Sequence, residues 1–253
     1  MTISYTQNEI MAIVAGRFIK NHDIIFAGTG VAMLAATVAK RIFAPQAVVF
    51  FETGGIDPAL DEIPMAVADL RVMSGTAINS GLIEAFSIVG HRKLHTIAFL
   101  GAAQIDKFGN LNTTCIGDYQ RPKARFSGSG GSNDAASLAS GVIVFMQHEP
   151  RRFVEKLDYL TSIGWCQGSD SRAKLGLRRG GPLAAVTNLG VMKFDAQTKE
   201  MYAAEYYPGV TPDRIRENTG FSIDTSRAKE AVPPQAEELH ILREQVDPGK
   251  LIL

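Results

Sequence analysis

The chain has 253 residues, of which 45% are hydrophobic and 21% are charged, a composition typical of globular proteins with a sizeable core. Lysine and arginine number 26 in total, as do aspartate and glutamate, so no overall field favours binding to nucleic acid or to an anionic membrane. Two cysteines exclude a zinc ribbon or a disulfide framework, and the absence of a signal-like or membrane-spanning apolar run leads us to expect a cytoplasmic protein.

The first third of the chain has the pattern of a parallel α/β unit. Residues 6–20 carry apolar side chains at helical spacing, and Thr6 with Glu9 forms a candidate capping box. Residues 24–27 predict a strand, Gly28 and Gly30 a tight turn, and residues 31–41 a helix. Because Met33 stands where a third glycine would complete a dinucleotide fingerprint, we expect no Rossmann cofactor site here.

A single carboxylate, Glu52, follows the second predicted strand, residues 47–51. Gly54 and Gly55 come next and permit a turn that side chains with a Cβ disfavour. An ionised carboxylate is costly to bury without partners, so Glu52 is either an exposed strand end or a group that the protein uses chemically. The local sequence leaves both interpretations open.

Polar loops follow two further predicted strands. Residues 82–89 predict a helix and residues 96–100 a strand, which runs into a glycine-rich loop containing Gln104. A turn then leads to a polar extended segment containing Asn112. Ligand sites gather at the carboxyl ends of parallel strands, so these loops are candidates for a binding site.

A basic segment with Arg121, Lys123 and Arg125 precedes a glycine-rich run and a predicted helix over residues 135–140. The run consists of Gly128, Ser129, Gly130 and Gly131. It is either a flexible loop or a set of backbone N–H groups arranged to bind an anion. The three cations could contact a phosphate or a substrate carboxylate, or belong to a solvated face or a subunit interface.

The remaining chain completes an α/β pattern without repeats or an interdomain linker. His148 ends a strand over residues 141–147 and is either a structural histidine or an acid–base group. The other elements expected are an irregular excursion over residues 153–181, strands over residues 183–186, 190–194 and 201–207, and helices over residues 212–219 and 237–246. We therefore predict one domain, residues 1–253, with an open, mostly parallel sheet flanked by helices.

Taken in order, the loops resemble those of the B (β) subunits of class I CoA-transferases over nearly the whole chain, and most closely those of glutaconate CoA-transferases. Ten short motifs carry the resemblance: residues 28–30 (GTG), 52–57 (ETGGID), 101–106 (GAAQID), 109–112 (GNLN), 116–119 (IGDY), 126–131 (FSGSGG), 146–153 (MQHEPRRF), 206–208 (YYP), 217–221 (ENTGF) and 247–249 (DPG). Each motif is weak by itself, whereas their common order is specific.

The resemblance implies the CoA-transferase (NagB/ribose-5-phosphate isomerase-like) fold, with Glu52 as a nucleophile that carries CoA as a glutamyl-CoA thioester. It implies that Asn112 orients Glu52 and that Gly130 and Gly131 donate N–H groups to an oxyanion. Contacts to substrate or CoA are implied for Gly54, Gly55, Gln104, Gly128, Ser129, Arg121 and Arg125. Coenzyme A enters as a substrate, no metal or permanent cofactor is expected, and the site requires an A-type partner subunit in a heterodimer or higher oligomer.

Three functions remain open at this point. The first is transfer of CoA between an acyl-CoA, such as the short dicarboxylic glutaconyl-CoA, and a carboxylic acid. The second is decarboxylation or C–C hydrolysis on the same scaffold, although members of those branches depart from glutamate at the position of Glu52. The third is a non-catalytic ligand sensor, since a fold does not fix a function.

Overall fold

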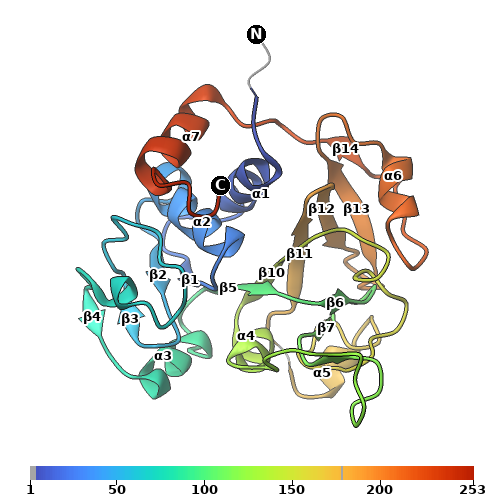
Figure 1. Cartoon of the computed structure of the whole chain (residues 1–253). Coiled ribbons are helices and arrows are strands. Elements are labelled where there is room, and N and C mark those ends of the chain that lie inside the picture. The colour runs from blue at the N-terminus through green and yellow to red at the C-terminus, as the bar shows by residue number, and fades with distance from the viewer. Residues whose placement is uncertain (1–3, 178) are drawn as a thin grey trace. The chain divides into compact units, whose positions relative to one another are not determined.

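A computed structural model describes residues 4–177 and 179–253, and the chain divides into two compact units (Figure 1). Unit 1 comprises Met1–Phe99 and Pro233–Leu253, and unit 2 comprises Leu100–Val232. The expected family domain over residues 1–253 stays a prediction. Within the described ranges, no helix has both the length and the apolar character needed to cross a membrane.

Unit 1 is built on three parallel strands with β1 in the middle. Ile24 of β1 lies opposite Val48 of β2 on one side and Thr96 of β5 on the other. The sheet continues beyond β2 through two short antiparallel strands, with Phe50 paired to Ile56. The bounds are β1 Ile24–Phe26, β2 Val48–Phe50, β3 Gly55–Ile56, β4 Ile78–Asn79 and β5 Thr96–Gly101, the last two residues of β5 being counted with unit 2. The apolar runs thus form the predicted strands, with small differences at their ends.

The helices of unit 1 begin where their sequences predict. Thr6 Oγ1 accepts a hydrogen bond from the Glu9 amide at 3.2 Å, and the Glu9 carboxylate accepts one from the Thr6 amide at 2.7 Å, which confirms the capping box. In Figure 1, α1, α2 and α7 gather above β1 and β2, and α3 lies below. The bounds are α1 Gln7–Gly16, α2 Val31–Val38, α3 Leu82–Val89 and α7 Ala236–Ile241, with a 3₁₀ turn Leu70–Met73 and π-helical turns Ala39–Phe43 and Leu242–Val246 after α2 and α7.

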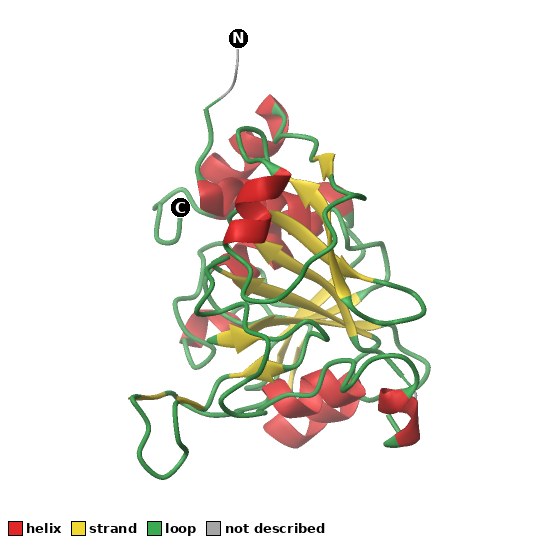
Figure 2. Cartoon of the chain, turned by 90° about the vertical axis from the view of Figure 1, so that its right-hand side faces the viewer, coloured by secondary structure: helices red, strands yellow, loops and turns green. Residues whose placement is uncertain are grey.

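Unit 2 contains a mixed sheet. Strand β10 pairs in parallel with β11, β11 and β13 both pair antiparallel with β12, and β14 pairs in parallel with β13. Figure 2 shows these strands in yellow, with α6 in front of β13, which it contacts. The bounds are β10 Gly141–Met146, β11 Pro182–Thr187, β12 Gly190–Phe194, β13 Met201–Tyr206, β14 Lys229–Glu230 and α6 Pro212–Glu217. The predicted α/β class is confirmed, with antiparallel strands added to the parallel pairs.

Shorter elements of unit 2 carry the predicted polar loops. They are the ladder of β6 Gln104–Ile105 with β7 Leu111–Asn112, the ladder of β8 Cys115–Ile116 with β9 Ala124–Arg125, and the helices α4 Ser132–Leu138 and α5 Ser171–Lys174. Helix α4 begins at Ser132, earlier than the predicted residue 135. Its first turn is closed by a bond from the Ala135 amide to the Gly131 carbonyl, so the chain becomes helical directly after the glycine run.

The long excursion between β10 and β11 is irregular, as predicted, and a buried arginine organises it. Arg172 is 2% exposed, and its guanidinium donates to the carbonyls of Ala136, Gly164 and Arg179 at 2.9, 2.9 and 3.1 Å. The three carbonyl groups lie in separate segments of the chain. The Arg172 side chain therefore satisfies backbone acceptors that strand pairing satisfies in a regular sheet.

Candidate active site

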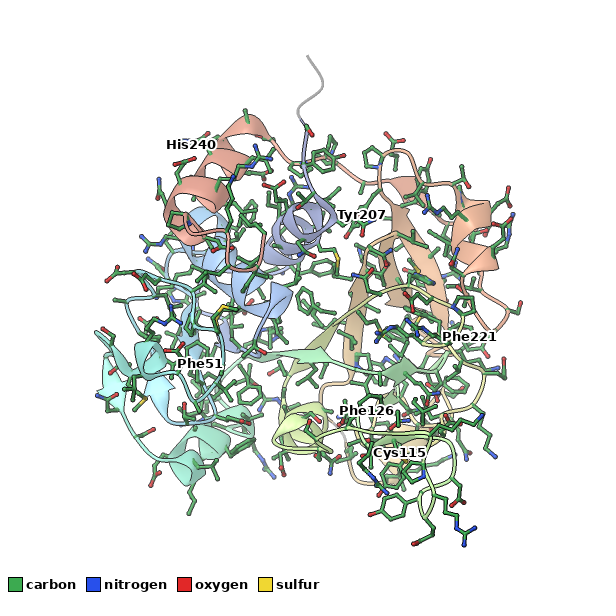
Figure 3. The ribbon with its side chains drawn as sticks, in the orientation of Figure 1. Phe51, Cys115, Phe126, Tyr207, Phe221 and His240 are labelled. Atoms are coloured by element: carbon green, nitrogen blue, oxygen red, sulfur yellow. The ribbon has the colours of Figure 1, made fainter. Side chains whose placement is uncertain are left out.

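Glu52 occupies a tight turn at the carboxyl end of β2. Phe51, which is fully buried, exchanges hydrogen bonds within this turn: its amide donates to the Gly55 carbonyl, and its carbonyl accepts from the Gly54 amide, both at 3.0 Å (Figure 3). Glu52 itself is half-buried, and no described residue of unit 1 donates a hydrogen bond to its carboxylate. The turn therefore holds a carboxylate on a rigid element and leaves its oxygens without protein donors in this unit.

The turn packs tightly against the segment that follows β4. Gly54 has a φ of +104°, and a Cβ there would lie 2.0 Å from the Ser80 carbonyl oxygen. The Ser80 amide and hydroxyl both donate to the Gly54 carbonyl, at 3.0 and 3.1 Å, and Thr53 Oγ1 donates to the Val67 carbonyl at 3.0 Å. Packing within unit 1 thus explains the glycine at position 54. Contacts of Gly54 and Gly55 with substrate stay a prediction.

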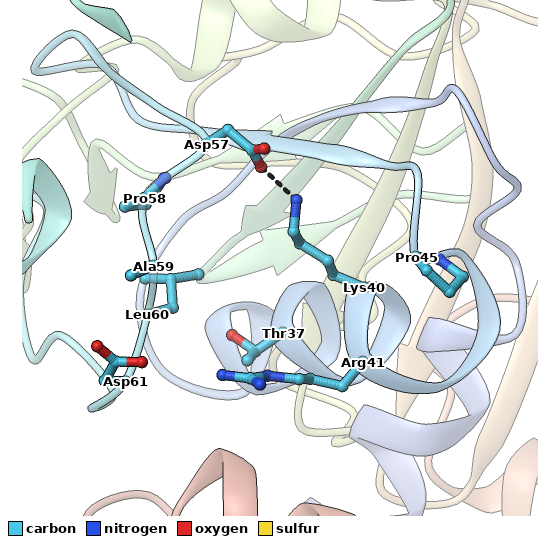
Figure 4. Close-up of a pocket in the computed structure, with 9 residues that line it drawn as sticks. All are labelled: Thr37, Lys40, Arg41, Pro45, Asp57, Pro58, Ala59, Leu60 and Asp61. Atoms are coloured by element: carbon cyan, nitrogen blue, oxygen red, sulfur yellow. Dashed lines mark hydrogen bonds and ion pairs between the residues drawn. The ribbon is translucent and has the colours of Figure 1, made fainter. Parts of the chain in front are cut away.

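Lys40 joins the two ends of the chain segment that carries Glu52. Its Nζ forms an ion pair with Asp57, directly after β3, and donates at 3.0 Å to the carbonyl of Ala47, directly before β2 (Figure 4). The ion pair borders a cavity of about 460 Å³ lined by Thr37, Lys40, Arg41, Pro45, Asp57, Pro58, Ala59, Leu60 and Asp61. Lys40 was missed at the sequence level because no local pattern links it to a residue 17 positions away.

Asn112 is fully buried in unit 2, and its amide is engaged there. Its Nδ2 donates to Gln104 Oε1 at 2.8 Å and to the Cys115 carbonyl at 2.6 Å, while its Oδ1 accepts from the Thr114 amide at 2.9 Å. Gln104 in turn donates to Asp158 at 3.0 Å. Both side chains therefore stabilise the β6–β7 ladder. A hydrogen bond from Asn112 Nδ2 to Glu52 would have to replace its bond to Gln104 or its bond to the Cys115 carbonyl. The predicted roles of Asn112 and Gln104 at substrate stay predictions.

The glycine-rich run contains backbone amides that make no hydrogen bond to a described residue, among them those of Gly130 and Gly131. The Gly128 amide donates to the Thr113 carbonyl at 3.1 Å, and Thr113 Oγ1 donates to the Gly128 carbonyl at 2.8 Å, so the run is tied to the segment after Asn112. Among the described residues, none accepts a hydrogen bond from the amide of Gly130 or Gly131. Two neighbouring N–H groups are thus available to an oxyanion or another acceptor.

Unit 2 also holds the other residues predicted to contact CoA or substrate, which are Ser129, Arg121 and Arg125. Ser129 Oγ accepts a bond from the Asn133 amide at 3.2 Å. Arg125 donates to the Tyr119 carbonyl at 2.6 Å and lies 4.6 Å from the centre of its ring. The side chain of Arg121 is exposed. Arg125 is therefore partly committed to the β8–β9 loop, and the contacts of these three residues with CoA stay a prediction.

His148 has the surroundings of a neutral core histidine. Its side chain is 2% exposed, it stacks on Phe153 with ring centres 3.8 Å apart, and its ring nitrogens lie 3.3 Å from Thr187 Oγ1 and 2.9 Å from Thr219 Oγ1. Burial lowers the pKa of His148 from 6.5 to about 3. The structure therefore favours the structural interpretation of this residue over the acid–base one.

No group of three or more histidine, cysteine, aspartate or glutamate side chains in the part of the chain that the structure describes is arranged to hold a metal ion. The chemistry offered by the described residues is that of a half-buried carboxylate in unit 1 and of free backbone amides in unit 2.

Comparison with known proteins places the chain in a family. Residues 8–218 match the family described as coenzyme A transferase. The B subunit of glutaconate CoA-transferase from Acidaminococcus fermentans is 42% identical over 99% of this chain and 96% of its own length. The B subunit of 3-oxoadipate CoA-transferase from Pseudomonas knackmussii is 37% identical over 95% of this chain and 93% of its own length. The crystal structure of glutaconate coenzyme A-transferase from Acidaminococcus fermentans superposes with a TM-score of 0.95 at 42% identity, covering 99% of this chain and 98% of that one. The chain therefore belongs to the coenzyme A transferase family.

Proposed function

We propose that this chain is the B subunit of a heteromeric CoA-transferase and that Glu52 carries CoA between a dicarboxylic acyl-CoA and an acceptor carboxylic acid. The observation that carries the proposal is the placement of Glu52, a half-buried carboxylate on the β2–β3 turn to which unit 1 offers no hydrogen-bond donor among its described residues. A carboxylate without donors keeps its electron density available for attack on a carbonyl carbon.

Formation of the enzyme thioester takes two substitutions, the first at the acyl carbonyl carbon and the second at the glutamyl carbonyl carbon. The Glu52 carboxylate attacks the thioester carbonyl of the acyl-CoA, expels the CoA thiolate and forms a mixed anhydride. The thiolate then attacks the glutamyl carbonyl of that anhydride and expels the acyl group as a free carboxylate, which leaves CoA bound to Glu52 as a thioester. The acceptor acid takes CoA by the reverse sequence, so nothing is oxidised and no ATP is consumed.

Each substitution passes through a tetrahedral oxyanion, and the free amides of Gly130 and Gly131 are suited to stabilise it. Removal of one donor from such a site typically costs about 3 kcal/mol in the transition state. The chain segment of these glycines is fixed to its surroundings by the paired bonds between Thr113 and Gly128. Donors held in advance need little reorganisation when the charge develops.

The partner is an A-type subunit, as the subunit names of the two transferase relatives imply. Large exposed apolar side chains between residues 65 and 83 of unit 1 support this assignment, because exposed apolar surface is typical of interaction sites. They are Met65, Leu70, Ile78, Leu82 and Ile83, which are 53, 85, 56, 58 and 76% exposed. The relatives are named for glutaconate and 3-oxoadipate, both dicarboxylic acids, which supports a dicarboxylic acyl group here.

The test uses the chain co-expressed with its A-type partner. Incubation with acyl-CoA followed by borohydride or hydroxylamine should modify Glu52, as read by mass spectrometry of the peptide that contains it. Glu52→Ala should abolish exchange of CoA between acids, and Glu237→Ala, an exposed carboxylate on α7, should leave it intact. Release of CO₂ from the acyl-CoA without transfer of CoA to any acid would show a decarboxylase instead.

A further inference from the structure

A second cavity lies in unit 2, and one of its lining residues, Phe126, stands two positions before the glycine-rich run. It has a volume of about 340 Å³ and is here named the Arg152 pocket, lined by Ala103, Ile116, Ala124, Phe126, Arg151 and Arg152. Four of the six side chains are apolar, and the two guanidinium groups come from the loop that follows β10. An apolar pocket with a few charged groups is the usual form of a small-molecule site, and this volume is at the small end of the range.

The pocket adjoins the groups proposed to act on the thioester. The Ala103 amide donates to the Asn112 carbonyl at 2.9 Å, and the Phe126 amide donates to the Thr114 carbonyl at 2.9 Å. Phe126 is 41% exposed and stands two residues before Gly128, as Figure 3 shows for its place in unit 2. Two walls of the pocket are therefore fixed to the segments that carry Asn112 and the free amides.

Arg152 has a donor with poor hydrogen-bond geometry. Its side chain is 32% exposed and its Nη1 lies 3.5 Å from the Ala102 carbonyl, at the limit of a hydrogen bond. Its Nε is buried and forms an ion pair with Glu149 Oε2 at 3.4 Å, but it makes no well-formed hydrogen bond to any described residue. A buried N–H without a well-formed hydrogen bond is costly, so this guanidinium favours the approach of a further acceptor.

The charges of the pocket suit a single carboxylate. Glu149 also accepts a bond from Arg151 Nε at 2.6 Å, so one carboxylate faces two guanidinium groups. The excess of one positive charge matches a monoanion and is small for the several phosphate charges of CoA. The planar fork of a guanidinium pairs with a carboxylate through two parallel hydrogen bonds, which favours a carboxylate as the ligand.

We propose that the Arg152 pocket binds the distal carboxylate of a dicarboxylic acyl group and that Arg152 sets the preference for dicarboxylic over monocarboxylic acyl-CoA. The apolar walls take the methylene groups between the two ends of the acyl chain, and the thioester end lies toward Gly130 and Gly131. This inference rests on the proposed function and names the part of the chain that recognises its substrate class.

The test compares glutaryl-CoA with pentanoyl-CoA, which has a methyl group in place of the distal carboxylate. Binding is measured by calorimetry on the heteromer in a Glu52→Ala background, where no transfer is expected. Arg152→Met should raise the dissociation constant for glutaryl-CoA by roughly 10- to 100-fold, as expected for loss of a charge-assisted pair, and leave that for pentanoyl-CoA unchanged. Arg152→Lys, which keeps the charge and loses the fork, should have an intermediate effect.

Two further variants keep the result interpretable. Glu149→Gln removes the carboxylate that competes for the guanidinium groups and should tighten glutaryl-CoA binding alone, an effect that a misfolded variant cannot produce. Arg214→Met, an exposed arginine on α6, should change neither constant. If Arg152→Met weakens the binding of glutaryl-CoA and pentanoyl-CoA equally, Arg152 contacts the CoA moiety that the two share. If it weakens the binding of neither, the pocket does not bind the distal carboxylate. Either result overturns the proposal.

The outcome is separable from that of the proposed function. If the heteromer with Glu52 intact transfers no CoA, but Arg152→Met still weakens glutaryl-CoA alone, the transferase assignment fails and the carboxylate site stands. If transfer occurs and the two ligands respond alike, the transferase assignment stands and the carboxylate site fails.

Discussion

Replacement of His148 by glutamine should remove a defined part of the pH dependence of folding. The native imidazole has a pKa of about 3 because it is buried, against 6.5 for the ordinary group. The unfolded chain therefore binds a proton more readily than the native chain does. The stability that depends on neutral His148 is complete above pH 6.5 and is lost as the pH falls toward 3.

The magnitude follows from the two pKa values. Between pH 7 and pH 5 the unfolded imidazole becomes almost fully protonated while the native one stays neutral, which lowers the free energy of unfolding by about 2 kcal/mol. The groups that face the ring are Thr187, Thr219 and Phe153, and none of them titrates in this range. None of these contacts carries a charge that would stabilise the protonated ring and so offset the effect of burial on the pKa of His148.

Urea unfolding at pH 7 and pH 5, followed by the fluorescence of the single tryptophan, measures this difference. Trp165 belongs to unit 2, as His148 does, and its Nε1 donates to the Pro182 carbonyl at 3.0 Å, so its emission reports this unit. His148→Gln should lose about 2 kcal/mol less than the parent chain between the two pH values. His240→Gln, at an exposed position on α7, should behave as the parent (Figure 3). Equal losses in His148→Gln and the parent would refute the argument from burial.

Three further predictions concern the supports of the candidate site and of unit 2. Lys40→Met should lower kcat about tenfold with little change in KM, because misplacement of the Glu52 turn affects the reacting geometry, and Lys40→Arg should restore most of the rate in a steady-state transfer assay. Gly54→Ala should destabilise unit 1 by on the order of 3 kcal/mol in thermal unfolding, since its Cβ would meet the Ser80 carbonyl, whereas Gly30→Ala, with open space around it, should cost about 1 kcal/mol. Arg172→Met should lower the urea stability reported by Trp165 fluorescence by about 3 kcal/mol, because it leaves several buried carbonyls without donors, and the exposed Lys174→Met should not.

The parts of the fold that the sequence predicts well are those decided by neighbouring residues. The capping box at Thr6, the helix Leu82–Val89 and the strand beginning at Thr96 depend on periodicity and on groups a few positions apart. The predicted start of α4 was three residues late, because Ser132, Asn133 and Asp134 are common in loops, whereas the bond from the Ala135 amide to the Gly131 carbonyl begins the helix at Ser132.

Residues whose role depends on distant segments could not be assigned from the sequence. The environment of His148 is set by Thr187 and Thr219, which are 39 and 71 positions away. The Arg152 pocket draws its walls from the segments after β5 and β10 and from the β8–β9 ladder. Local sequence shows that Arg152 is a cation beside Glu149, but not that its Nε is buried without a well-formed hydrogen bond to any described residue.

The hydrogen bonds around Glu52 bear on whether this glutamate can act as a nucleophile. Strong hydrogen bonds to a carboxylate stabilise its charge and lower its tendency to attack a carbonyl carbon, so a nucleophilic carboxylate should be held by its backbone instead of by donors to its oxygens. Glu52 meets this condition within unit 1, where Phe51, Gly54 and Gly55 fix the turn through main-chain bonds. Asn112, by contrast, has its amide satisfied by Gln104 and Cys115. If it orients Glu52 during the reaction, Asn112→Ala should reduce the rate of thioester formation far more than Gln104→Glu, which keeps an acceptor for the Asn112 amide. Similar losses in the two variants would mean that Asn112 acts by bracing the β6–β7 ladder.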